Sequence, residues 1–437
     1  MSYQQIYKNY RTLILSFVAI TYPIITNALT LNDAIIIAHE NNYKILAEQQ
    51  NFEAVKMQKP KAYSDLLPNV YFNNTNYHQT YKNPAVRDIK GSPYYRQYGL
   101  NISQPLFNGG ATFAKIKIAD KSVESGLARF NNVSNEITAN SVQAYEGVLT
   151  YREIYEINVK NHKVFEKNLE FTKIRFDVGV VTRTDVLQTE LRLANATAQK
   201  EKAYADMKNS EAYFMHVMGV APDSHLEQID LTHIVVPSSI DELLEIANGS
   251  NPGLHASRID SKAAKYQVNV AASQMLPTVS ANAQLVRSSD SKLPNNSLSS
   301  TSGNTYTLQV QVPIFQGGAE YADIKQKKHL ANKAKLDSQE AERQLTESCI
   351  TVWNNYKTVK SVILARLNAI DAASQALKGV EEEVNVGTRT TLDLLNAEKE
   401  LFDAKVGHRL AKQDLVNSVY QMLQVMGKLS VSNPNDV

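Results

Sequence analysis

The chain has 437 residues, of which 46 are Lys or Arg and 44 are Asp or Glu, so its formal net charge is +2 at pH 7. Nucleic-acid-binding proteins usually carry a basic excess or a basic stripe, so this balance argues against a nucleic-acid partner. The only cysteine, Cys349, excludes an intramolecular disulfide and a zinc site built from several cysteines. Beyond the N-terminus no apolar run reaches the roughly 18 residues of a helical membrane span. If the protein crosses a membrane, we expect it to use strands.

The first 28 residues have the features of a secretory signal. Lys8 and Arg11 precede a short apolar stretch, Leu13–Ile25, and the small residue Ala28 stands at the expected cleavage point. A short membrane anchor is the alternative interpretation. We expect residues 1–28 to be removed, and because residue 29 is Leu rather than Cys, the new N-terminus would not be lipid-modified on cysteine.

The rest of the sequence contains an internal repeat. Four landmarks recur at a nearly constant offset: Leu67–Pro68 as Leu276–Pro277, Gln104–Gly110 as Val312–Gly318, Val178–Val180 as Val386–Thr388, and Met218–Gly219 as Met426–Gly427. Such spacing predicts two copies of one unit. We place the first copy at residues 29–219 and the second at 239–427, with a connector at 220–238 and a short tail at 428–437.

Each copy is expected to open with a helix and continue with two strands. The helices are predicted at 31–64 and at 240–274, the second broken near Asn251–Gly253. Alternating apolar and polar residues predict the strands, which we place at about 67–82, 94–107, 276–290 and 304–315. The turn-rich links between paired strands are expected at 83–93 and 290–303.

Long helical hairpins are predicted after each strand pair, at about 111–218 and 319–427. The clearest breaks within them are Gly179 and Gly387, and an uninterrupted helix from 111 to 177 would be ~100 Å long. The returning helices carry a seven-residue pattern typical of coiled-coil packing. Its members are Leu193, Ala196, Ala203, Met207, Ser210 and Phe214 in the first copy, and Leu401, Ala404, Ala411, Leu415, Ser418 and Met422 in the second.

Four strands of this length are long enough for an outer membrane but too few to close a barrel, since the smallest barrels have about eight. An open sheet edge in lipid would leave backbone groups unsatisfied. The chain is therefore expected to oligomerise through its strands, as a dimer or a trimer, or to keep them out of the membrane.

Several segments of the sequence resemble the TolC family of outer-membrane efflux proteins. The matching segments are Leu29–Ala34, the two Pro-[Leu/Ile]-Phe-x-Gly-Gly junctions at Pro105–Gly110 and Pro313–Gly318, and the two turns Val178–Asp185 and Val386–Asp393. The resemblance implies an α+β membrane protein, a homotrimer whose 12-stranded outer-membrane β-barrel continues into a long periplasmic α-helical barrel. It also implies an exit duct for tripartite efflux pumps or type I secretion, joined through a periplasmic adaptor to an inner-membrane pump.

The resemblance also assigns functional positions. Adaptor docking is expected at the hairpin tips, Val178, Gly179, Val386 and Gly387, which lie farthest from the membrane if the strands are at the other end; helix termination alone is the alternative role of these glycines. The resemblance makes Arg389 a lock that bonds across to Thr184 and Asp185 at the periplasmic gate, where the family has Tyr in place of Val384. Asp393 and Asn396 match two acidic constriction positions; Asn396 is neutral, so one carboxylate ring would remain. Local helix capping by Thr182 or Thr184, and by Thr390 or Thr391, is the alternative role of these turns.

Two other classes of function are less compatible with the sequence. We find no nucleophile, P-loop or metal motif, so we expect neither an enzyme nor a cofactor. A soluble periplasmic coiled-coil adaptor or structural protein would share the signal and the hairpins, but it would not need two pairs of amphipathic strands. The Tyr-rich first strand pair is expected to form an interfacial aromatic belt or to pack inside the barrel.

Overall fold

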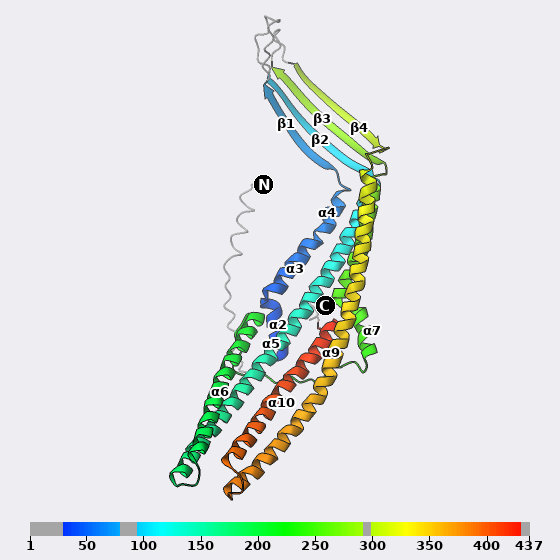
Figure 1. Cartoon of the computed structure of the whole chain (residues 1–437). Helices are drawn as coiled ribbons and strands as arrows, with labels where there is room; N and C mark the ends of the chain where they lie inside the picture. The colour runs from blue at the N-terminus through cyan, green and yellow to red at the C-terminus, as the bar shows by residue number, and fades with distance from the viewer. Residues whose placement is uncertain (1–28, 79–93, 292–298, 430–437) are drawn as a thin grey trace.

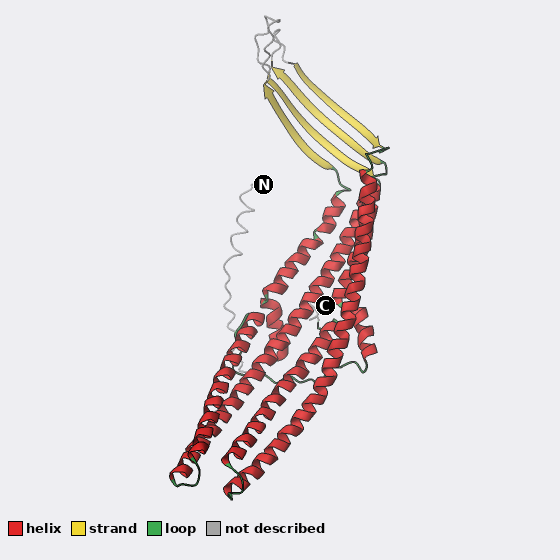
Figure 2. Cartoon of the chain, viewed as in Figure 1, coloured by secondary structure: helices red, strands yellow, loops and turns green. Residues whose placement is uncertain are grey.

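The computed structural model of the chain describes residues 29–78, 94–291 and 299–429. A four-stranded sheet lies at one end of these residues, and long helices run away from it to two exposed turns at the other end (Figure 1). Most of the described chain is helical (Figure 2). The expected signal at 1–28, the link at 83–93 and most of the tail, 430–437, lie outside the described residues.

One antiparallel sheet contains all four strands, in the order β1-β2-β3-β4. The strands are β1 (Asn69–His78), β2 (Tyr94–Asn108), β3 (Thr278–Ser291) and β4 (Ser299–Gln311). The central pair joins the two halves of the chain, since Leu100 of β2 lies opposite Leu285 of β3. The outer edges of β1 and β4 have no strand partner among the described residues.

The register places one apolar band across the whole sheet. Val70, Ile102, Ala283 and Tyr306 form a row from β1 to β4. Because side chains alternate between faces along a strand, the neighbouring residues of this kind, Phe72, Leu100, Leu285 and Leu308, lie on the same face. On this face Phe72 is 65% exposed and Leu308 is 67% exposed. One face of the sheet therefore presents apolar side chains to its surroundings.

The strand boundaries differ from the predicted ones where prolines intervene. The strand predicted at 304–315 instead covers Ser299–Gln311, and it ends before Pro313, which has no N–H for a ladder bond. Much of the link predicted at 290–303 is therefore strand, and only 292–298 falls outside the described residues. β1 and β3 begin after Pro68 and Pro277, two residues later than predicted, because the preceding residues complete helical turns.

Aromatic residues of the first strand pair are divided between the two faces. Phe72 stacks on Tyr98 on the apolar face, with ring centroids 6.3 Å apart. Tyr77 and Tyr95, which pair on the opposite face, have centroids 4.6 Å apart. Because side chains alternate between the faces, only some tyrosines of the first strand pair share the apolar face. An interfacial aromatic belt that contains all of them is therefore not compatible with this register.

Shorter helices precede each strand pair. They are α2 (Leu31–Asn41), α3 (Tyr43–Lys56), α4 (Gln58–Ser64), α7 (Ile240–Ser250) and α8 (Pro252–Ser273). The stretch predicted as helical at 31–64 consists of three helices, because breaks that the sequence did not predict occur at Asn42 and Met57. Asn42 donates from Nδ2 to the Val217 carbonyl at 2.8 Å and caps α3 through Oδ1. Asn251 makes the matching bond to the Val425 carbonyl at 3.0 Å, at the break that the sequence did predict.

The longest helices are α5 (Ala111–Asp177) and α9 (Ala319–Asn385), each of 67 residues. At 1.5 Å per residue each spans ~100 Å. They return as α6 (Arg183–Met218) and α10 (Thr391–Val425). Gly109 has a φ of 63°, and a Cβ there would lie 2.4 Å from the Ser273 carbonyl oxygen, so the strand-to-helix junction requires glycine.

Small side chains are buried where the returning helices pack, as the seven-residue pattern predicts. Ala196, Ala203 and Ser210 are buried on α6, and Ala404, Ala411 and Ser418 are buried on α10. Cys349 is buried against Leu243 and Val352, and burial raises the pKa of its thiol. Among the described residues, no helix combines the length and the apolar character needed to cross a membrane.

Candidate functional site

The two hairpin turns lie at the end of the bundle farthest from the sheet (Figure 1). Gly179 and Gly387 adopt left-handed backbone conformations, with φ of 75° and 82°. The Val180 N–H donates to the Arg175 carbonyl at 2.9 Å, and the Thr388 N–H donates to the Glu383 carbonyl at 2.9 Å. These bonds close both long helices in the same way, with glycine at the position after the helix end.

Valine side chains at these turns are exposed. Val178 is 69% exposed, Val180 is 62% exposed and Val386 is 75% exposed. A Cβ added at Gly179 or Gly387 would meet no atom within 4 Å, so both glycines face open space. Apolar side chains grouped on a protruding turn are typical of a surface that another molecule covers.

Asp185 and Asp393 both act in capping boxes. Asp393 Oδ2 accepts from the Thr390 N–H at 3.0 Å and from its hydroxyl at 2.7 Å, while the Asp393 N–H donates to Thr390 Oγ1 at 3.2 Å. Asp185 and Thr182 repeat the arrangement at the first turn. The hydrogen bonds from Thr390 lower the pKa of the Asp393 carboxyl. Of the candidate caps, Thr182 and Thr390 are therefore the ones used.

Arg389 pairs within its own hairpin. Its Nε donates to Glu383 Oε2 at 2.8 Å, and both side chains are about half exposed. Among the described contacts within the chain, none joins Arg389 to Thr184 or Asp185, the partners that the family resemblance implies. Val384, which stands where the family has Tyr, is only 4% exposed and lies in the last helical turn of α9.

Two hydrogen bonds connect the hairpins to each other near this end. Arg192 Nη2 on α6 donates to Asn396 Oδ1 on α10 at 2.8 Å. Asn168 Nδ2 on α5 donates to Glu398 Oε2 on α10 at 2.6 Å. Burial raises the pKa of the Glu398 carboxyl. Apart from Asn396, sequence analysis missed these residues, because nothing in the sequence reveals which turns of α5, α6 and α10 lie at the same height.

A buried ion pair connects the hairpins farther from the turns. Arg409 of α10 and Glu146 of α5 are each 3% exposed, and their Nη1 and Oε1 atoms are 2.8 Å apart. Arg409 Nε lies 2.6 Å from Glu153 Oε2, an ion-pair distance without hydrogen-bond alignment. A buried guanidinium needs such partners, because removal of a charge from water carries a large desolvation cost.

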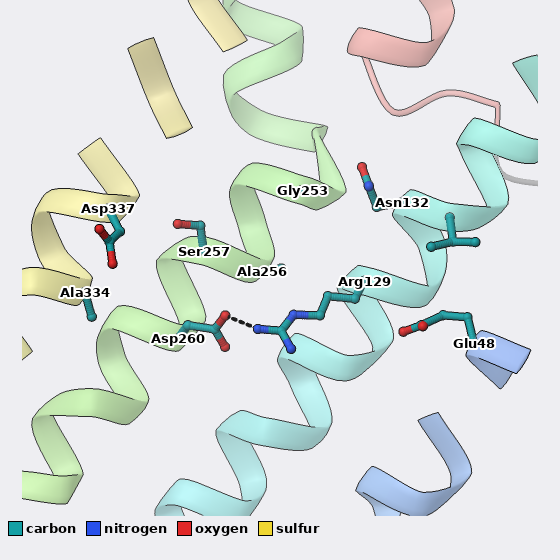
Figure 3. A pocket seen from close by; sticks show the side chains of 10 residues that line it. Glu48, Arg129, Asn132, Gly253, Ala256, Ser257, Asp260, Ala334 and Asp337 are labelled. Atoms are coloured by element: carbon teal, nitrogen blue, oxygen red, sulfur yellow. Dashed lines mark hydrogen bonds and ion pairs between the residues drawn. The ribbon is translucent and has the colours of Figure 1, made fainter. Parts of the chain in front are cut away.

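Nearer the sheet, a groove of about 460 Å³ lies among α3, α5, α8 and α9 (Figure 3). Arg129 of α5 forms an ion pair with Asp260 of α8 across it, and Ser125 Oγ donates to the same carboxylate at 2.6 Å. Glu48 and Asp337 lie on its two sides (Figure 3). These bonds attach the second half of the chain to the first and account for the charges of Arg129 and Asp260 in the groove.

Comparisons with known proteins agree with this architecture. The family model described as outer membrane efflux protein matches residues 34–220 and 243–428. The chain is 30% identical to the outer membrane efflux protein BepC of Brucella suis, over 76% of this chain and 72% of BepC. It is 25% identical to TolC of Vibrio cholerae, over 92% and 91%, and 26% identical to the alkaline protease secretion protein AprF of Pseudomonas aeruginosa, over 90% and 83%. The solved structure of CusC has the same fold, with a TM-score of 0.81, 13% identity and 91% coverage of each chain.

A small sheet with one apolar face, continued by ~100 Å helices that end in exposed turns, defines a class of outer-membrane export channels with a large periplasmic extension. The family model matches two segments that together cover most of the chain, and the relatives match over most of their own length. The chain belongs to the outer membrane efflux protein family.

Proposed function

We propose that three copies of the chain assemble into a duct through which an inner-membrane pump exports its cargo. The observation that carries this proposal is a four-stranded sheet with two unpaired edges, continuous with two helices of 67 residues. Three such sheets would supply twelve strands and close the edges of β1 and β4 against neighbouring copies. The apolar band of the sheet would then face lipid.

The helices at the two sides of the chain support the same assembly. In Figure 1 the four long helices lie in the order α6, α5, α10, α9, so α6 and α9 are the outer ones. Large apolar side chains are exposed on both: Leu191 on α6 is 60% exposed, and Leu364 on α9 is 61% exposed. Contact between α9 of one copy and α6 of the next would cover them and close a helical barrel.

A detergent-extracted sample is therefore expected to have three times the mass of one mature chain in native mass spectrometry. The physical reason is the cost of open strand edges in an apolar medium, several kcal/mol for each unsatisfied backbone group. Urea-denatured protein provides the single-chain reference mass. A folded, membrane-inserted monomer or dimer would contradict the proposal.

We also propose two structural repeats, residues 29–219 and 239–427, with a connector at 220–238. The double match of the family model supports this division. The equal lengths of α5 and α9, and the matching bonds of Asn42 and Asn251, support it further. One ancestral unit used twice would explain why the sheet and the hairpins each contain two similar halves.

The hairpin tips are proposed as the docking surface for a periplasmic adaptor. Val178, Gly179, Val386 and Gly387 form it, because they lie at the end opposite the sheet and expose apolar side chains. Through the adaptor, the duct would serve a proton-driven or ATP-driven inner-membrane pump, in drug efflux or in type I secretion. We propose no catalytic activity and no cofactor for the chain.

Introducing carboxylates at the tips, with Val178→Glu and Val386→Glu together, is expected to reduce adaptor cross-linking and efflux by about tenfold or more. An adaptor that covers the tip would have to bury each new charge without a partner. Valine positions are preferable to Gly179, where any side chain would also strain a backbone φ of 75°. Val235→Glu is the matched control, since Val235 is 86% exposed on the connector. Equal loss in the control, or no loss at the tips, would count against docking there.

Thr184, Asp185 and Arg389 are proposed as gate residues and Asp393 and Asn396 as pore-constriction residues. In a trimer Arg389 would bond to Thr184 or Asp185 of the neighbouring copy in place of Glu383. Asp393 remains available as a charge, because its capping bonds use mainly one carboxylate oxygen and lower its pKa. A ring of these carboxylates in a narrow passage would favour cations.

Asp393→Asn is therefore expected to abolish cation preference in planar bilayers, measured as the reversal potential in a salt gradient. The amide oxygen can still accept from Thr390, so the cap is largely kept while the charge is removed. Because the folded pKa of Asp393 is lowered, unaltered channels should keep their preference down to a pH below the ordinary value of 3.8 and lose it only under more acidic conditions. The matched change at the other capping box, Asp185→Asn, should have a smaller effect. Unchanged selectivity in Asp393→Asn would leave capping as its only role.

A further inference from the structure

A second groove, of about 300 Å³, lies between α10 and the first hairpin. Phe165 of α5, Arg192 and Lys202 of α6, and Lys399 and Phe402 of α10 contribute its charged and aromatic walls. Its volume is at the lower end of the range for small-molecule sites, about 300–1,000 Å³. Both hairpins contribute side chains, so an occupant would contact the two hairpins at once.

Helical spacing places these side chains together. On α6, Arg192, Asn195, Gln199 and Lys202 follow one another at intervals of three or four residues, and therefore lie along one face. On α10, Lys399 and Phe402 are separated by one turn and face the same groove. The sequence alone could not bring the two sets together, because they belong to different hairpins.

The charges of the groove are of one sign. Of the ten residues that line it in the described part of the chain, three are cationic and none carries a carboxylate. Arg192 bonds to the neutral amide of Asn396, so its charge has no counter-charge there. Ion pairs among the described residues of α6 and α10 do not include Lys202, whereas Lys399 pairs with Asp403 one turn along its own helix. At least two positive charges therefore remain uncompensated at its rim.

The floor of the groove is apolar and fixed. Phe165 is 4% exposed and Ala196 is 3% exposed, and both pack with Leu395 in a cluster that joins α5, α6 and α10. Phe402 adds a second ring at the side. A ligand that fits would combine a flat apolar body for the aromatic floor with an anionic group for the cations at the rim.

We propose that this groove binds amphipathic organic anions, that is, carboxylates or sulfonates attached to an aromatic or fused-ring body. The anion would accept from Arg192 and Lys202, in charge-assisted hydrogen bonds, while the apolar body lies against Phe165 and Phe402. Because the groove belongs to both hairpins, an occupant would bridge them next to the Arg192–Asn396 bond. Binding of this kind does not depend on channel activity, so its failure would leave the proposed function untouched.

The test uses the full mature chain in amphipol, free of detergent micelles that would absorb the probe. 2-Naphthoate is the probe, and binding is measured by equilibrium dialysis. 2-Naphthalenemethanol, which has the same body without the charge, and acetate, which has the charge without the body, are each expected to bind about tenfold more weakly or worse. Raising NaCl from about 0.05 to 0.5 M should weaken naphthoate binding, because salt screens exposed charges. The neutral analogue should change little.

Lys202→Gln is expected to weaken naphthoate binding about tenfold, and Phe402→Ala should weaken naphthoate and its neutral analogue together. Lys200→Gln is the matched control, since Lys200 lies two residues away on α6, pairs with Glu201 and does not line the groove. Should the variants fail to fold, the salt and analogue series on the unaltered chain still decides the question. Absence of naphthoate binding, equal binding of the three probes, or equal loss in Lys200→Gln and Lys202→Gln would overturn the proposal.

Discussion

Replacing Arg409 by Met is expected to lower the free energy of unfolding by about 3–5 kcal/mol, the cost typical of breaking a buried ion pair. Glu146, which is 3% exposed, would keep its carboxylate with no cation near Oε1. Its other contact, from Thr150 Oγ1 at 3.4 Å, is too long to replace a guanidinium. The loss should also weaken the packing of α10 on α5, which would then depend on the Asn168–Glu398 bond and on apolar contacts such as Phe165 with Leu395.

The double variant Arg409→Met with Glu146→Met is expected to recover most of this loss. Methionine is an unbranched apolar residue close in length to glutamate, and an apolar pair of suitable volume can replace a buried ion pair at little cost. Arg389→Met is the matched control: its pair with Glu383 is about half exposed, and such pairs contribute about 1 kcal/mol or less. Chemical denaturation followed by circular dichroism measures all three. Equal destabilisation by Arg409→Met and Arg389→Met would show that burial does not set the contribution of this contact.

Local signals allowed most elements of the fold to be predicted. Gly110 and Gly318 mark the starts of the long helices, and proline-free stretches with one Val-Gly break indicate where those helices turn. Asn42 shows the limit of such signals. It ends α2 because its amide reaches the Val217 carbonyl, a contact with a residue far along the chain. Pro252 marked the equivalent break in the second half, whereas the first half has no proline to mark it.

For the site, the sequence predicted contacts within a single turn but not contacts between the hairpins. Spacing within one segment limited the caps to Thr182 or Thr184 and to Thr390 or Thr391, and the structure uses Thr182 with Asp185 and Thr390 with Asp393. Contacts between hairpins join residues about 200 positions apart in the sequence. They depend on how far each helix is shifted along the bundle axis, which no local pattern specifies. Asn396 was predicted from family resemblance to line a constriction, and within one chain it accepts a bond from Arg192. A carboxylate at the Asn396 position would therefore lie beside a guanidinium.

Removing the two hydrogen bonds that connect the hairpins near their turns, with Arg192→Ala and Asn168→Ala in one chain, is expected to raise single-channel conductance severalfold in planar bilayers. A hydrogen bond contributes about 0.5–1.5 kcal/mol net, and bonds to charged groups contribute more. In the proposed trimer, six such bonds would amount to roughly 3–9 kcal/mol. That range includes the ~5.5 kcal/mol that converts a population of 1:99 into 99:1. Loss of these bonds would therefore remove a free energy comparable to the whole difference in free energy between the closed and the open entrance.

Arg389→Ala tests whether Arg389 closes the entrance through a contact between chains or through a contact within one chain. Inside one chain Arg389 bonds to Glu383 of its own hairpin, so its loss frees neither hairpin from the other. If Arg389 holds a neighbouring copy in the trimer, its removal should raise conductance as well, and the effect should add to that of the Arg192 and Asn168 changes. Lys173→Ala serves as the control, because Lys173 pairs with Glu190 within the first hairpin. An unchanged conductance in the double variant would exclude the bonds between hairpins as a closing device. If Arg389→Ala alone opens the channel fully, closure depends on contacts between copies and not on the bonds between the two hairpins of one chain.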